Sequence, residues 1–222
     1  MTYLLFSTTK GLVKKTPLEE YLNIRRSGLV AIKLDQGDRL LSTHLTKGND
    51  EVMLVAASGK CIKFNEKDIR TTGRATRGVR GIKIKDNDQV VSMQIITSSE
   101  YAKKSEEKSL PVNQLLIVTE NGYGKRTSLR GYKPQGRGGQ GVFTAKVTKK
   151  TGHIVGSYLA GSQDKESDLL IISQAGKIIR LPLRQIPQLG RHTQGVKLIR
   201  LDPGDSVASL TLLTREHEII KT

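Results

Sequence analysis

The chain has 222 residues, which is enough for one large domain or two small ones with a buried core. Its net charge is +16 and its isoelectric point lies near 10.0, so we expect an anionic partner: nucleic acid first, an acidic protein or a membrane surface second. A single cysteine, Cys61, excludes an internal disulfide, and the sequence has neither an apolar run of about 18 residues nor a secretory signal, so we expect a soluble, cytoplasmic protein.

Four segments of the chain follow one pattern, and they are expected at residues 3–46, 51–97, 114–160 and 167–213 of a single repeat domain spanning 1–222. Each has an apolar strand, a turn ending in glycine, a second strand, a polar loop, a second glycine and a third strand. The first glycines are Gly11, Gly59, Gly122 and Gly176, and the second glycines are Gly28, Gly78, Gly141 and Gly195. By subtraction, the two glycines are 17, 19, 19 and 19 residues apart. The polar segment 98–113 is expected to be an insertion between the second and third repeats.

Two further positions keep this register. A basic residue follows each first glycine by four positions: Lys15, Lys63, Arg126 and Arg180. An aspartate follows the second glycine by ten positions in three repeats, as Asp38, Asp88 and Asp205, whereas the third repeat has a longer turn. Short strands rich in Val, Ile and Leu, joined by glycine turns, predict about four strands per repeat of about 50 residues and hence an all-β, propeller-like ring. The capping-box pattern at 16–19 predicts at most one turn of helix.

Common catalytic and metal-binding patterns are missing from the sequence. Residues 136–141 match G-x-G-x-x-G, but a strand-like segment follows them instead of a helix, which argues against a dinucleotide site. The sequence contains no P-loop and no nucleophile elbow, and its four histidines have no zinc spacing. We therefore expect no catalytic residue, metal site or cofactor in this domain.

The polar loops before the second glycines are basic. Their cations include Arg25 and Arg26; Arg74 and Arg77, with Arg80 nearby; Arg130, Lys133 and Arg137; and Arg184 and Arg191. A ring would bring equivalent loops to one curved, positively charged rim. Because aromatic residues make up only 4% of the chain, and none is Trp, stacking on single-stranded bases is not expected. A duplex bound through its phosphates fits better, and bending it by 40–90° over 20–30 base pairs would cost about 1–6 kcal/mol.

The runs EVMLVAASGKCIKF, RGVRGIKI, NGYGKRTSLRGY and GRHTQGVKLIR resemble the C-terminal domain of the A subunit of bacterial DNA gyrase, with the topoisomerase IV counterpart as a close relative. The resemblance covers residues 3–213. It implies a β-pinwheel of four-stranded blades that exchange their outer strands and wrap duplex DNA. It also implies a parent enzyme, an A2B2 assembly with the B subunit, that uses ATP and Mg bound elsewhere to introduce negative supercoils.

Two features of the resembling family bear on the site. The box Q-R-R-G-G-K-G has its nearest match at residues 135–141, where Gln135, Arg137, Gly138, Gly139 and Gly141 carry over. The catalytic tyrosine of such enzymes follows an arginine, and none of the six tyrosines here does. The resemblance therefore implies a domain that binds DNA without cutting it.

From the loops, the register and the box, we expect a non-catalytic, duplex-wrapping module. Its expected DNA-binding residues are Lys15, Arg25, Arg26, Lys63, Arg74, Arg77, Arg80, Lys125, Arg126, Arg130, Lys133, Gln135, Arg137, Gly138, Gly139, Gly141, Arg180, Arg184 and Arg191. Two alternatives stay open: a topoisomerase IV domain that selects DNA crossings without stable wrapping, and a protein-interaction propeller that docks an acidic partner.

Overall fold

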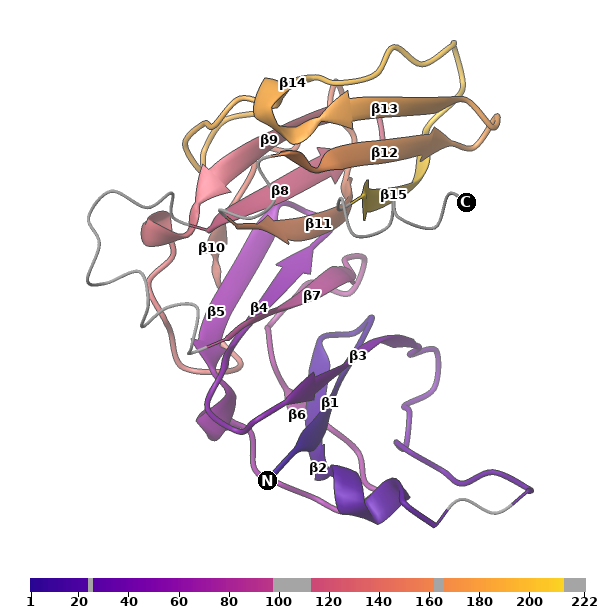
Figure 1. The fold of residues 1–222 in the computed structure, drawn as a ribbon, viewed down its shortest axis with the longest axis vertical. Coiled ribbons are helices and arrows are strands. Elements are labelled where there is room, and N and C mark those ends of the chain that lie inside the picture. The colour runs from indigo at the N-terminus through magenta and orange to yellow at the C-terminus, as the bar shows by residue number, and fades with distance from the viewer. Residues whose placement is uncertain (24–25, 98–112, 162–165, 214–222) are drawn as a thin grey trace. The chain divides into compact units, whose positions relative to one another are not determined.

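The computed structural model describes residues 1–23, 26–97, 113–161 and 166–213, which form short strands and single 3-10 turns without an α-helix (Figure 1). The strands are β1 (Tyr3–Thr8), β2 (Leu12–Pro17), β3 (Leu40–Thr46), β4 (Glu51–Ala56), β5 (Lys60–Asn65), β6 (Val79–Arg80), β7 (Val90–Ile96), β8 (Gln114–Thr119), β9 (Tyr123–Ser128), β10 (Val142–Phe143), β11 (Ile154–Ala160), β12 (Asp168–Ser173), β13 (Ile178–Pro182), β14 (Val196–Lys197) and β15 (Val207–Leu213). The 3-10 turns are η1 (Leu18–Tyr21), η2 (Glu66–Asp68), η3 (Leu129–Gly131) and η5 (Leu183–Gln185). The all-β class is confirmed. The insertion predicted at 98–113 lies, apart from Asn113, outside the described residues.

The chain divides into two compact units. Unit 1 comprises Met1–Ala56, Lys60–Glu106 and Lys133–Val142, and unit 2 comprises Ala57–Gly59, Glu107–Tyr132 and Phe143–Thr222. The sheets have the strand orders β3-β1-β2-β6, β10-β5-β4-β7, β11-β8-β9-β14 and β13-β12-β15. No helix of the described residues is long and apolar enough to cross a membrane.

The outermost strand of a sheet is supplied by the repeat that follows in the sequence. Strand β6 of the second repeat pairs with β2 of the first, with Val79 opposite Val13 and Arg80 opposite Leu12. Strand β14 of the fourth repeat pairs in the same way with β9 of the third. Strand β10 of the third repeat lies beside β5 of the second. These pairings confirm the strand exchange that the resemblance implies.

The fourth sheet has three strands, and the described part of the chain contains no fifth repeat that could supply an outer strand. Residues 29–30 are the register equivalents of β6 in the first repeat, and they form no strand. Val30 is consequently exposed, as is Ile178 on β13.

Each unit has its own apolar core. In unit 1 it is formed by Leu5, Val13, Val52, Leu54, Ile62, Phe64, Ile69, Ile82, Val90 and Met93. In unit 2 it is formed by Leu116, Val118, Ala160, Leu169, Ile171, Leu183, Ile186, Ile199 and Val207. The second strand of a hairpin can be covered on both faces: five successive residues of β2, 12–16, are buried. Such a strand loses the alternation of apolar and polar residues that marks a half-exposed sheet.

Close packing of the exchanged segments depends on the second glycines. Gly141 has a φ of +69°, and a Cβ built on it would clash with the carbonyl oxygen of Cys61 on β5. Gly195 meets the backbone of Gly124 on β9 in the same way. A side chain at either position would therefore push the exchanged segment off the neighbouring strand.

Gly141→Ala is expected to lower the free energy of unfolding by about 2–4 kcal/mol, because it combines a left-handed backbone with a backbone clash. Gly176→Ala is the matched control: its φ is +82°, but no atom lies within 4 Å of the added Cβ, so only the conformational cost of about 1–2 kcal/mol remains. Urea unfolding of both variants measures the difference. Equal losses would contradict the proposed clash.

The aspartate ten residues after the second glycine ties two turns together. Asp38 Oδ1 accepts hydrogen bonds from the backbone amides of Lys10 and Arg39 at 2.9 and 2.8 Å. Asp205 Oδ1 accepts the equivalent bond from Ala175 at 3.0 Å. In the third repeat, the backbone carbonyl of Thr151 accepts the bond from Asn121 instead, at 3.0 Å. A longer turn thus replaces the missing aspartate.

The stability of the protein should therefore fall in acid. Burial alone would raise the pKa of the Asp38 carboxyl, but hydrogen bonds from two hydroxyls and two backbone amides outweigh it and hold the pKa below the ordinary value of 3.8. The stabilisation is fully present above the unfolded-state pKa and is lost as the pH falls from about 4 through the lower folded-state pKa. Thermal melts between pH 2 and 6 should show this loss, and Asp38→Asn should flatten it. An unchanged pH profile in the variant would refute the assignment.

Candidate nucleic-acid interface

The three basic loops are built alike, and we name them loop 2 (70–78), loop 3 (133–141) and loop 4 (187–195). Each follows a 3-10 turn and contains the pattern G-R-x-x-[QR]-G, at 73–78, 136–141 and 190–195. A threonine hydroxyl tightens two of them: Thr76 donates to the carbonyl of Gly73 at 2.8 Å, and Thr193 donates to that of Gly190 at 2.9 Å. Local sequence therefore sets the conformation of the loops.

Each loop docks on the preceding repeat through the same backbone bond. The carbonyl of Lys15 accepts from the amide of Thr72 at 2.9 Å, and the carbonyl of Lys63 accepts from that of Gln135 at 2.7 Å. The carbonyl of Arg126 accepts from Leu189 at 2.8 Å. The position four residues after the first glycine is thus where the next loop attaches.

Within unit 1, loop 3 contacts residues that flank loop 2 on both sides. The guanidinium of Arg137 donates to the carbonyl of Asp68 at 3.1 Å and to that of Arg80 at 2.5 Å. The amide of Lys83 donates to the carbonyl of Gly139 at 2.8 Å. Arg137, the box arginine, therefore holds loop 3 against the second repeat, and its side chain is only partly exposed.

Loop 4 repeats this arrangement within unit 2. Arg191 donates from Nη1 to the carbonyl of Phe143 at 3.3 Å, and its guanidinium lies over the ring of Tyr132 at 5.7 Å. The amide of Lys146 donates to the carbonyl of Thr193 at 3.1 Å. Phe143 is the register equivalent of Arg80, so the loop arginine reaches the same carbonyl in both units.

Three of the expected DNA-binding residues are buried, and the assignment is corrected for them. Lys15 donates from Nζ to the carbonyl of Glu66 at 3.0 Å, and Lys63 forms an ion pair with Glu51 at 2.9 Å. Lys125 has no exposed surface. Because β2, β5 and β9 are the second strands of hairpins covered on both faces, these ammonium groups cannot reach a phosphate. Arg126 is half-buried and donates from Nε to the carbonyl of Ile186 at 2.7 Å.

Lys125 instead stabilises loop 4 through hydrogen bonds from its buried ammonium group. Its Nζ donates to the carbonyls of Gly190 and Arg191 at 2.6 and 2.9 Å and to the hydroxyl of Thr193 at 3.0 Å. Burial, with a smaller contribution from the charge of Arg191, lowers the pKa of Lys125 to about 8. Its register equivalent Lys14 is also buried and donates to the carbonyl of Arg74 in loop 2. Burial lowers the pKa of Lys14 to about 8 as well, although the charge of Glu20 opposes the shift.

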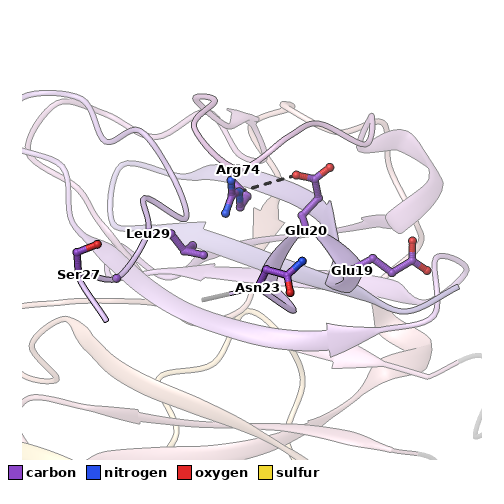
Figure 2. Close-up of a pocket in the computed structure, with 7 residues that line it drawn as sticks. Glu19, Glu20, Asn23, Ser27, Leu29 and Arg74 are labelled. Carbon is purple, nitrogen blue, oxygen red and sulfur yellow. Dashed lines mark ion pairs between the residues drawn. The ribbon is translucent and has the colours of Figure 1, made fainter. Parts of the chain in front are cut away.

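Other expected residues are exposed but paired with carboxylates. Arg77 contacts Asp35 at 2.6 Å, and Arg180 contacts Asp168. Figure 2 shows Arg74 opposite Glu20 in a hollow that Glu19 also lines, and the Arg74 Nε to Glu20 Oε2 distance is 3.8 Å. Such surface pairs contribute little, typically about 0–1 kcal/mol, so a phosphate can compete for these arginines.

Five expected cations are exposed and form no ion pair with a described residue: Arg26, Arg80, Arg130, Lys133 and Arg184. Arg25 lies outside the described residues. Gln135, Gly138, Gly139 and Gly141 are partly exposed, and the backbones of Gln135, Gly138 and Gly139 make hydrogen bonds within unit 1.

The sequence interpretation missed one row of cations. A basic residue lies five positions after every second glycine: Lys33, Lys83, Lys146 and Arg200. All four side chains are exposed, and the backbone amides of the first three donate to the following loop. The glycine register, extended by one more position, could have found them.

Among the described residues, no group of three or more His, Cys, Asp or Glu side chains could hold a metal ion.

The family model of the DNA gyrase C-terminal domain, beta-propeller, matches residues 2–47, 50–97, 113–159 and 167–213. The chain belongs to the DNA gyrase C-terminal domain family. The resemblance inferred from the sequence is thereby confirmed.

Relatives and solved structures agree with this family. The chain is 41% identical to the DNA gyrase A subunit of Salmonella typhimurium over 204 residues, which are 92% of this chain and 21% of that protein. It is 39% identical to the DNA gyrase A subunit of Deinococcus deserti over 218 residues, which are 97% of this chain and 25% of that protein. The chain therefore spans about a quarter of the length of these gyrase subunits.

Two solved C-terminal domains have the same fold. The C-terminal domain of DNA topoisomerase IV matches with a TM-score of 0.85 and 27% identity, covering 97% of this chain and 62% of that one. The DNA gyrase A C-terminal domain matches with a TM-score of 0.78 and 28% identity, covering 96% of this chain and 66% of that one. The chain is thus of the gyrase A and topoisomerase IV A C-terminal type.

Proposed function

We propose that this chain is a non-catalytic module that binds duplex DNA through its phosphates and wraps it. The observation that carries the proposal is the exposed row Lys33, Lys83, Lys146 and Arg200, which recurs at one register position in all four repeats and lies next to the basic loops in the first three. Phosphates require positive charge and hydrogen-bond donors but no particular base, so binding should tolerate any sequence.

The salt dependence of binding follows from the number of free cations. The five exposed, unpaired cations of the expected set and the four row cations make nine candidate contacts. If all nine contact phosphates, the slope of log K against log salt is about −8. Fluorescence anisotropy with a 30-base-pair duplex of random sequence, between 50 and 200 mM salt, measures it.

The same anisotropy assay, with polyglutamate added as a competitor, separates a duplex-binding domain from a propeller that docks an acidic protein. Excess polyglutamate should compete only weakly with the duplex, because phosphate spacing and groove shape are absent from it. A chain that releases the duplex at 100 mM salt but retains polyglutamate would refute the proposal and favour the protein-docking alternative.

In the proposed parent enzyme, the module serves the A subunit of a type II topoisomerase, more specifically that of gyrase. DNA cleavage, ATP and Mg would reside in other domains, the B subunit would complete an A2B2 assembly, and the enzyme would act on chromosomal DNA in the cytoplasm. The identity to the gyrase relatives supports this version. The structural likeness to a topoisomerase IV domain favours the second candidate, which holds DNA crossings without stable wrapping.

A further inference from the structure

A hollow of about 480 Å³ on unit 1 is lined by four cations among its eight residues. Lys10 comes from the turn between β1 and β2, and Arg80, Lys83 and Lys85 come from the exchanged segment of the second repeat. The remaining lining residues are Ile82, Ile84, Asp86 and Asp88. Four positive and two negative side chains leave the hollow with a net charge of +2.

The cations of the hollow keep donors available for a ligand. Arg80, Lys83 and Lys85 are exposed and form no ion pair with a described residue. Lys10 donates from Nζ to the carbonyl of Gln36 at 2.7 Å, and its ammonium carries two further protons. Asp88 is engaged in its own turn, where Oδ1 accepts from the amide of Gln89 at 2.9 Å. The lining therefore offers an anion several charged donors.

The backbone that carries these cations is fixed. The amides of Gly81 and Ile82 donate to the carbonyl of Gly11 at 2.8 and 3.3 Å, and the Ile82 side chain is buried. Lys83 is held by its bond to Gly139, and the Arg80 carbonyl accepts from Arg137. An anion that binds here orders side chains only, so the entropic cost of binding is small.

No other described repeat collects this charge. The positions two, five and seven residues after the second glycine are Arg80, Lys83 and Lys85 in the second repeat. They are Val30, Lys33 and Asp35 in the first, Phe143, Lys146 and Thr148 in the third, and Lys197, Arg200 and Asp202 in the fourth. Asp35 and Asp202 are themselves paired with Arg77 and Lys177. The hollow is thus specific to the second repeat.

We propose that this hollow is a phosphate-binding site that binds the backbone of the duplex more tightly than the equivalent surface of the other repeats. The inference rests on the proposed function, since it assigns the strongest contact within that interface. The ligand is a phosphodiester group, and free inorganic phosphate shares the same chemistry.

The test compares Lys83→Gln/Lys85→Gln with the control Lys149→Gln/Lys150→Gln, which removes the same charge from an exposed turn of the third repeat. Losing two phosphate contacts at 0.1 M salt should weaken duplex binding on the order of 10- to 60-fold and shallow the salt slope by about 1.8. The control should change affinity by about 3-fold or less. Unchanged thermal melts for both variants verify that the fold is intact.

A titration of the unmodified chain with inorganic phosphate, followed through the backbone amide signals of residues 80–85, tests the hollow without DNA. Saturable shifts at these residues, abolished in the Lys83→Gln/Lys85→Gln variant, support the site even if the duplex does not bind and the proposed function fails. Equal losses of duplex affinity in the two variants overturn the inference and leave the proposed function standing. An absence of phosphate-induced shifts at 80–85 also overturns it.

Discussion

Neutralising three exposed cations in or beside loops 3 and 4, in the variant Arg130→Gln/Lys133→Gln/Arg184→Gln, is expected to weaken duplex binding by about 100-fold at 0.1 M salt. Each lost phosphate contact releases about 0.9 fewer counterions, so the salt slope should become shallower by about 2.7. The loss should be the same for duplexes of different sequence, because phosphate contacts carry no base information. Anisotropy titrations with an A·T-rich and a G·C-rich duplex measure both quantities.

The matched control is Lys47→Gln/Lys149→Gln/Lys150→Gln, which removes three exposed charges from turns outside the loops. It lowers the net charge by the same amount, so it reports the general electrostatic attraction alone. If the control binds as weakly as the triple variant, then Arg130, Lys133 and Arg184 are not part of the contact surface. A strong difference between the two duplexes would argue for base readout instead.

Replacing Lys125 with Met is expected to lower the free energy of unfolding by about 2 kcal/mol. The change removes the ammonium donor from two carbonyls and one hydroxyl of loop 4. The Gly190 carbonyl keeps its bond from the Thr193 hydroxyl, and an acceptor left without a partner costs about 1–3 kcal/mol. Relief from burying a charge offsets part of this loss. Urea unfolding measures the total, and hydrogen exchange should show faster opening of the Lys146 amide, which donates to Thr193 in loop 4.

Ile62→Met is the control, because Ile62 is the register equivalent of Lys125 in the second repeat and holds no polar group of loop 3. A swap between apolar side chains of similar size should cost less than about 1.5 kcal/mol and leave loop exchange unchanged. Equal behaviour of the two variants would mean that Lys125 only fills space.

The pH dependence separates these roles further. Because burial lowers the pKa of Lys125 to about 8, the unfolded chain holds a proton between pH 8 and about 10.5 that the folded chain has released. Stability should therefore rise with pH across this window. The Met variant should lose part of this rise and keep the part that comes from Lys14.

The glycine register was sufficient to predict the repeats, because a hairpin turn needs a positive φ and admits little except glycine. Gly11, Gly59, Gly122 and Gly176 all have φ between +77° and +90°. The turn aspartates keep a constant spacing because Asp38 and Asp205 accept a hydrogen bond from the amide that precedes the first glycine of the repeat. Strand exchange, in contrast, could be predicted only from the resemblance, because the sequence of a two-residue strand such as β6 does not show which strand it pairs with.

The sequence could not separate structural cations from surface ones. Lys15, Lys63 and Lys125 lie on strands covered on both faces, where alternation no longer distinguishes inside from outside. Their regular spacing follows from loop docking and hairpin packing. The row at Lys33, Lys83, Lys146 and Arg200 has the same regularity and is exposed. A basic residue that recurs at one repeat position can serve either the fold or ligand binding. The burial of its side chain in the structure separates these two roles.

The most direct test of wrapping is the linking number of a nicked circular plasmid that is closed by ligase while the chain is bound. If the exposed cations guide the duplex along a curved path, the linking number of the closed product should shift in one direction and in proportion to the amount of bound protein. An unchanged topoisomer distribution at protein concentrations that saturate the plasmid would contradict wrapping, and would leave a domain that holds DNA without bending it around itself.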